Sequence, residues 1–251
     1  MDGWQAEWTI DSLDETRRRC LCSPSGSRDR FTHFGKLFTG SQPSREYDAF
    51  CRAATIGLTA RHDGIPTPIG GKLDCGLPIL VFQRREGMTL NEWLNLDTAP
   101  QPMFRRLDVA SKIVAALQHV HRMGYIHGSV SADHVLVKPD DSIALVGWGS
   151  CEIVGAKLPP LNQHVHSLRQ PSAPERSGTT QASSSEDIFA LAYVLGELLG
   201  QSFMASPIAR SLLSADPFQR PTTGEIAKLL NHFQSAISNT PDFGQSMPIA
   251  A

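Results

Sequence analysis

The residue types that most often bind metal ions form two short pairs in this chain. Cys20 and Cys22 lie one residue apart, and neither a second cysteine pair nor a histidine cluster follows at the spacing of a zinc site. His164 and His166 are also one residue apart, and two histidines at this spacing in a loop read as solvated side chains. We therefore predict ordinary thiols, solvated imidazoles and no metal centre.

A second group of polar side chains follows the longest helical pattern. Residues 104–123 carry apolar side chains at helical spacing, and the polar segment 125–134 comes directly after them. Two short apolar runs, residues 135–137 and 143–146, flank the turn-forming residues 138–141 and predict a β-hairpin. A helix and a hairpin should thus hold His127, Ser129, Asp133 and His134 in a short connecting segment.

Further motifs follow this hairpin in order. They are Val146-Gly147-Trp148-Gly149, then Ala173-Pro174-Glu175, then Asp187 before the apolar helix 188–199, and finally Asp216-Pro217-Phe218-Gln219-Arg220-Pro221. Together with Tyr125-Ile126-His127-Gly128-Ser129-Val130-Ser131-Ala132-Asp133-His134, they resemble the core of the protein kinase family over residues 77–235. The resemblance implies an α+β fold of two lobes, a small β-rich lobe with one main helix and a larger helical lobe.

The resemblance assigns structural roles to three residues of the large lobe. Glu175 should pair with Arg220, and Asp187 should accept hydrogen bonds from the backbone of segment 125–134. Removing one partner of such a buried pair costs several kcal/mol. The presence of all three residues implies a large lobe that is built in the ordinary way.

The family's catalytic positions carry other residue types here. A kinase uses a carboxylate for the substrate hydroxyl, an asparagine for one magnesium ion and an aspartate for the other. Ser129, His134 and Gly147 occupy these three positions. A serine hydroxyl is a poor base, and glycine has no oxygen ligand in its side chain for magnesium. Asp133 could stand in, but we expect a surface or capping carboxylate.

The small lobe departs from the family as well. The stretch 11–16 replaces the family's glycine-rich loop, contains no glycine and carries three acidic side chains that should repel a triphosphate. Lys36 occupies the position of the phosphate-binding lysine, and Glu46 is its candidate helix partner, ten residues later. Phe34 shares the strand face of Lys36 and should fill the space of an adenine base.

The remaining elements complete this architecture. Strands are predicted over residues 7–13, 18–23, 31–38 and 77–82, with a helix over 45–58 between the last two. In the second lobe, Thr89 and Glu92 form a capping box, a helix is predicted over 223–237, and residues 201–214 leave room for two or three helical turns. The predicted division is 1–86 for the N-terminal lobe, 87–237 for the C-terminal lobe and 238–251 for a flexible tail.

Composition narrows the class of protein. A net charge of -2 and a pI near 6.5 over 251 residues give no reason to expect nucleic acid or an anionic membrane, and we expect the basic run Arg17–Arg19 to be solvated. No apolar stretch reaches the roughly 18 residues of a membrane helix, and the N-terminus lacks a secretory pattern. Five cysteines, an odd number, favour a reducing compartment. We therefore expect the cytoplasm.

The leading functional hypothesis is a pseudokinase, a domain that is not an enzyme. It would act in signalling as a scaffolding or regulatory module that binds another protein, without a cofactor beyond weak ATP binding. The alternative is a divergent ATP-binding kinase, or another phosphate or nucleotide transferase, that uses Lys36, Glu46 and either Asp133 or Glu152. A third possibility is a pseudokinase that senses a nucleotide without transferring phosphate.

Overall fold

The fold is described from a computed structural model of the chain. The described residues are 4–12, 17–29, 32–41, 44–69, 71–72, 77–83, 87–96, 101–158, 172–178 and 180–238. The predicted flexible tail, His164, His166 and most of the stretch that replaces the glycine-rich loop therefore lie outside the described residues, as does the predicted lobe boundary at residue 86. These expectations stay predictions.

The N-terminal part is an antiparallel sheet with the strand order β1-β2-β3-β5-β4. Its strands are β1 (Trp4–Ser12), β2 (Arg17–Pro24), β3 (His33–Phe38), β4 (Gly71–Lys72) and β5 (Pro78–Gln83). In the β2–β3 ladder, Arg19 lies opposite Lys36 and Cys20 lies opposite Gly35. Because side chains directly opposite each other in an antiparallel pair share one face, Arg19 and Lys36 point to the same side of the sheet.

Helix α1 (Arg45–Thr59) packs against this sheet. The hydroxyl of Ser44 caps its first turn by accepting a hydrogen bond from the backbone N–H of Tyr47, at 3.1 Å. Phe38 of β3 is fully buried and contacts the rings of Tyr47 and Phe50. These aromatic contacts determine which side of α1 faces the sheet.

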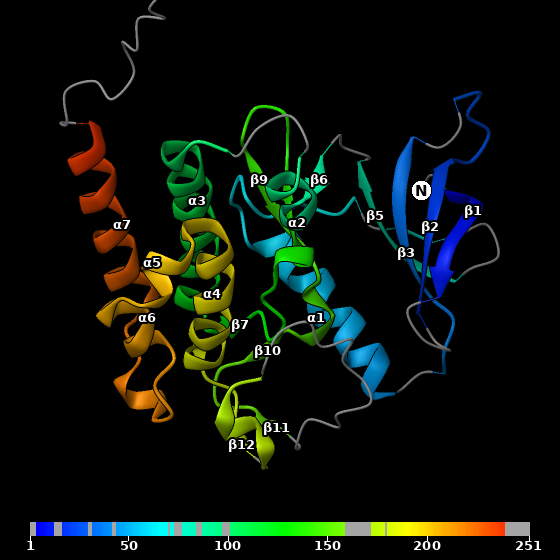
Figure 1. Ribbon diagram of the computed structural model, residues 1–251. Coiled ribbons are helices and arrows are strands. Elements are labelled where there is room, and N and C mark those ends of the chain that lie inside the picture. Colours follow the sequence, from blue (N-terminus) through cyan, green and yellow to red (C-terminus); the bar gives the residue numbers. More distant parts are fainter. Residues whose placement is uncertain are drawn as a thin grey trace, which may run out of the picture.

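The C-terminal part is mainly helical. Its helices are α2 (Leu90–Leu94), α3 (Met103–Arg122), α4 (Ser184–Leu199), α5 (Gln201–Met204), α6 (Pro207–Leu212) and α7 (Thr223–Ser238). Their apolar faces form the main core, in which α3 and α4 contribute most of the fully buried side chains. Figure 1 shows the sheet at one end of the molecule, the helices α3, α4 and α7 at the other, and α1 between them.

Short elements connect the two parts. The strands β6 (Met88–Thr89), β8 (Val135–Val137) and β9 (Ile143–Leu145) form one small sheet, and β7 (Tyr125–Ile126) pairs with β10 (Glu152–Ile153). The pair β11 (Lys157–Leu158) and β12 (Thr180–Gln181) flanks residues 159–171. Single turns of 3-10 helix are η1 (Ala132–His134), η2 (Trp148–Ser150), η3 (Pro174–Ser177) and η4 (Pro217–Gln219).

The structure confirms the predicted α+β fold, with a β-rich N-terminal part that has one main helix and a helical C-terminal part. The predicted capping box is present, since Thr89 and Glu92 bond reciprocally at the start of α2. Among the described residues, no helix combines the length and the apolar composition that a membrane span requires.

Candidate functional site

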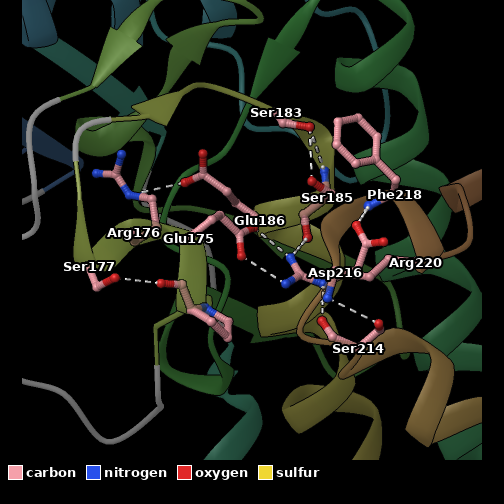
Figure 2. A network of polar contacts seen from close by, with 11 residues as sticks. Glu175, Arg176, Ser177, Ser183, Ser185, Glu186, Ser214, Asp216, Phe218 and Arg220 are labelled. Atoms are coloured by element: carbon pink, nitrogen blue, oxygen red, sulfur yellow. Dashed lines mark hydrogen bonds and ion pairs between the residues drawn. The ribbon is translucent and has the colours of Figure 1, made fainter.

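Arg220 and Glu175 lie together inside the C-terminal part. The guanidinium donates two hydrogen bonds to the Glu175 carboxylate, at 2.7 and 2.8 Å, and two more to the backbone carbonyls of Ser214 and Ser185. Its side chain is fully buried and lies over the ring of Phe189. Figure 2 shows Arg220 joining the start of α4, η3 and the turn before η4. The pair is therefore a junction between three segments that are far apart in sequence.

The Asp187 cluster consists of His121, His127, Gly128 and Asp187. The buried carboxylate of Asp187 accepts hydrogen bonds from the backbone N–H groups of His127 (2.7 Å) and Gly128 (2.8 Å), and it bonds the His121 imidazole at 2.8 Å. Burial raises the pKa of Asp187, but the hydrogen bond and charge of His121, together with His127, outweigh burial and lower it. The carboxylate is thus ionised and holds the first half of segment 125–134.

His127 is the buried member of this cluster. Its Nε2 donates to the carbonyl of Val146 (2.8 Å), and its Nδ1 accepts from the backbone N–H of Ser129 (3.2 Å). Burial lowers the pKa of His127 to about 4, although the charge of Asp187 acts in the opposite direction. Both ring nitrogens are in use, so this neutral imidazole has a structural role.

The His134 cluster consists of Ser129, His134 and Gly147, the three positions predicted to lack the usual catalytic residues. The Ser129 hydroxyl lies 3.3 Å from His134 Nδ1, and the imidazole lies against Gly147. A Cβ atom on Gly147 would lie only 2.5 Å from two ring carbons of His134, and Gly147 has φ +90°. The imidazole therefore occupies the space that a side chain at position 147 would need.

A magnesium ion at the position that the family uses would need oxygen ligands. Glycine supplies no side-chain oxygen, and the ring of His134 blocks any larger residue. The described residues contain no group of three histidine, cysteine, aspartate or glutamate side chains placed to hold a metal ion. Magnesium does not fit at the position that the family uses.

Two cationic side chains of the sheet, Lys36 and Arg19, act electrostatically on His134. Burial lowers the pKa values of His127 and His134 and raises that of Cys151 to about 12, and the charge of Lys36 on β3 acts on all three groups in the lowering direction. Arg19 on β2, opposite Lys36, also lowers the pKa of His134. Arg19 was expected to be solvated and is instead half-buried beside the site. No sequence signal reveals this position, because the register of β2 against β3 places it there.

The proposed pair of Lys36 and Glu46 stays a prediction. Glu46 lies in the first turn of α1, is exposed, and forms no hydrogen bond or ion pair with any residue that the structure describes. Glu46 precedes the buried Ala49 by one helical turn, at the start of α1, where its side chain is exposed.

Helix α1 instead contacts the chain just beyond Gly147. Arg52 donates hydrogen bonds to the carbonyl of Cys151 (3.0 Å) and to the carboxylate of Glu152 (2.7 Å). Glu152, considered above as a catalytic substitute, is therefore engaged by α1. The sequence reasoning missed Arg52, because a single arginine on a helix gives no indication of its partner.

The structure also places Asp133 and Phe34, two residues that the sequence analysis considered for the nucleotide site. Asp133 is exposed and accepts a hydrogen bond from the side-chain amide of Asn91 at 2.6 Å, as a surface carboxylate does. Phe34 is half-buried on β3, two residues before Lys36 and therefore on the same face of the sheet.

Comparisons with known proteins establish the family. Residues 24–228 match the family of protein tyrosine and serine/threonine kinases, and the chain belongs to that family. It is 23% identical to a probable serine/threonine-protein kinase of Dictyostelium discoideum over 68% of this chain and 12% of that protein. It is 25% identical to a probable serine/threonine-protein kinase, PknB, of Lactococcus lactis over 68% of this chain and 25% of that protein.

A third relative is the serine/threonine-protein kinase US3 of human herpesvirus 2, which is 23% identical over 84% of this chain and 45% of that protein. The chain thus spans less than half the length of each of these three relatives. The predicted resemblance to protein kinases is confirmed.

The prediction that the chain is not an enzyme is wrong. Its family and its named relatives are kinases, and none of these comparisons indicates a loss of activity. The prediction equated three missing residue types with missing chemistry.

Proposed function

We propose that this chain is a divergent serine/threonine kinase domain that binds the phosphates of ATP with its own cations instead of carboxylate-bound magnesium. The observation that carries the proposal is the register of β2 against β3, which places Arg19 directly opposite Lys36 on one face of the sheet, and the charges of both side chains lower the pKa of His134. In the family, metal ions neutralise the phosphate charge at this place. Here the cations belong to the sheet, and the metal-ligand position is a glycine covered by an imidazole.

The protein partner in this proposal is the substrate that carries the serine or threonine hydroxyl. A reducing, ATP-containing compartment such as the cytoplasm suits the proposal, and the described cysteines, Cys20, Cys22, Cys51 and Cys151, are not joined in disulfides. The acidic stretch 11–16 and Phe34 oppose tight binding of an adenine nucleotide. We therefore expect an affinity in the millimolar to high micromolar range.

The first test measures the melting temperature with ATP, once with EDTA and once with magnesium. At 10 mM ATP, about ten times a dissociation constant of about 1 mM, binding should raise the stability by about 1.4 kcal/mol, or roughly 3 to 6 °C for a domain of this size. The shift should occur in EDTA. Lys36→Met should remove it, whereas Lys157→Met, a matched change at an exposed position on β11, should leave it intact.

The second test follows transfer of labelled γ-phosphate to a generic protein substrate, with analysis of the modified residue type. We expect phosphoserine or phosphothreonine. A thermal shift that requires magnesium would contradict the metal-free site. No shift in either condition at 10 mM ATP would overturn the proposal as a whole.

A further inference from the structure

His134 and His127 are neighbouring imidazoles that differ in burial and in hydrogen bonding. Their ring centroids lie 6.0 Å apart. Both nitrogens of His127 bond the backbone, and the residue is fully buried. His134 is only half-buried, at the end of η1. Of these two rings, only His134 is placed to exchange a proton with a bound molecule.

The tautomer of His134 follows from one hydrogen bond. Nδ1 lies 2.6 Å from the carbonyl oxygen of Ser129, and a carbonyl can only accept. Nδ1 must therefore carry the hydrogen, which leaves the lone pair of the neutral ring on Nε2. Nε2 makes no hydrogen bond to any residue of the described ranges. The hydrogen bond to the backbone thus leaves the basic nitrogen of His134 on the side of the ring away from Ser129.

The surroundings of His134 keep this ring neutral. Burial lowers its pKa, and the cations Lys36 on β3 and Arg19 on β2 lower it further. The hydrogen bond to the Ser129 carbonyl and the charge of Asp133 on η1 act in the opposite direction without reversing the shift. Its buried neighbour His127 has a pKa of about 4 and is itself neutral near pH 7.

From this geometry we propose that Nε2 of His134 accepts the proton of the substrate hydroxyl during phosphoryl transfer, in place of the carboxylate that position 129 lacks. The inference rests on the proposed function. The substrate oxygen forms a bond to the γ-phosphorus, and the bond between that phosphorus and the β–γ bridging oxygen breaks. ADP leaves with the electron pair, and the hydroxyl proton passes to Nε2 and then to water.

The test compares single-turnover transfer by the wild type and by His134→Gln. The amide can keep the contact to the Ser129 carbonyl but cannot accept the proton, so the rate should fall by about 10²- to 10⁴-fold. The wild-type rate should also fall as the pH decreases and His134 becomes protonated, and the variant should lose this dependence. His232→Gln, an exposed change on α7, is the matched control and should behave as the wild type.

Two further measurements keep the outcome interpretable. The thermal shift with ATP in EDTA should persist in His134→Gln, which separates the proton step from nucleotide binding. His134→Ala should recover part of its rate in added imidazole, and this also guards against a glutamine variant that folds poorly. An unchanged rate and pH profile in His134→Gln, or no transfer by a wild type that binds ATP, would overturn the inference. The absence of an ATP-induced rise in the melting temperature of the wild type would overturn the proposed function instead.

Discussion

The two halves of segment 125–134 have opposite characters. The first half, His127 and Gly128, is held by the Asp187 cluster, whose buried carboxylate matches the structural role that the kinase resemblance implied. The second half ends in the His134 cluster, where all three catalytic positions differ from the family. Positioning and chemistry are therefore separable within ten residues, and the family's scaffold can present a different set of reactive groups.

The largest effect should come from the scaffold. Arg220→Ala removes four hydrogen bonds and leaves the carboxylate of Glu175, 16% exposed, without its partner. We expect a loss of about 3 to 5 kcal/mol in the free energy of unfolding, measured by urea denaturation. Arg210→Ala, at an exposed position on α6, should change it by no more than about 0.5 kcal/mol. Equal losses of unfolding free energy in the two variants would show that the contacts of Arg220 contribute no more to stability than an exposed side chain does.

Acid should weaken the Asp187 cluster through His127. Its pKa is depressed from 6.5 to about 4, so the unfolded chain binds the proton more readily than the folded one. The stability from this neutral ring is complete above pH 6.5 and decreases by about 3 kcal/mol as the pH falls to 4. Urea denaturation from pH 4 to 7.5 should show this decrease in the wild type, and His127→Gln should reduce it.

Glu186 contributes with the opposite sign over part of this range. Burial raises its pKa to about 7, although Arg176 lowers it, so its contribution falls as the pH rises toward 7. The difference between the wild type and His127→Gln isolates the histidine term, because both proteins contain Glu186. An identical pH dependence in the two proteins would show that His127 is not held neutral by burial.

A smaller loss of stability is expected from a substitution in the His134 cluster. Gly147→Ala places a methyl group against the His134 ring at a positive φ, and we expect a loss of about 1 to 3 kcal/mol. In His134→Ala the space is open, so the same change should cost less, and only the backbone strain should remain. A double-mutant cycle of melting temperatures and unfolding free energies measures this coupling. Additive effects would mean that the ring does not occupy the space beside Gly147.

The sequence determined most of the fold, because each element carries its own signal. Helical spacing and capping residues predicted α2, α3, α4 and α7 to within a few residues, and the spaced motifs identified the kinase family. The Glu175, Asp187 and Arg220 positions could be named for the same reason, since each belongs to a motif. Strand β4, with two residues, has too short a pattern to be predicted.

Only the tertiary structure decided what surrounds the reactive positions. The register of β2 against β3 places Arg19 beside Lys36, and the packing of α1 leaves Glu46 exposed while Arg52 reaches Glu152. The contact between His134 and Gly147 joins residues 13 positions apart through a hairpin. Such relations depend on how elements pack, and packing is a property of the whole chain that no local pattern of residues encodes.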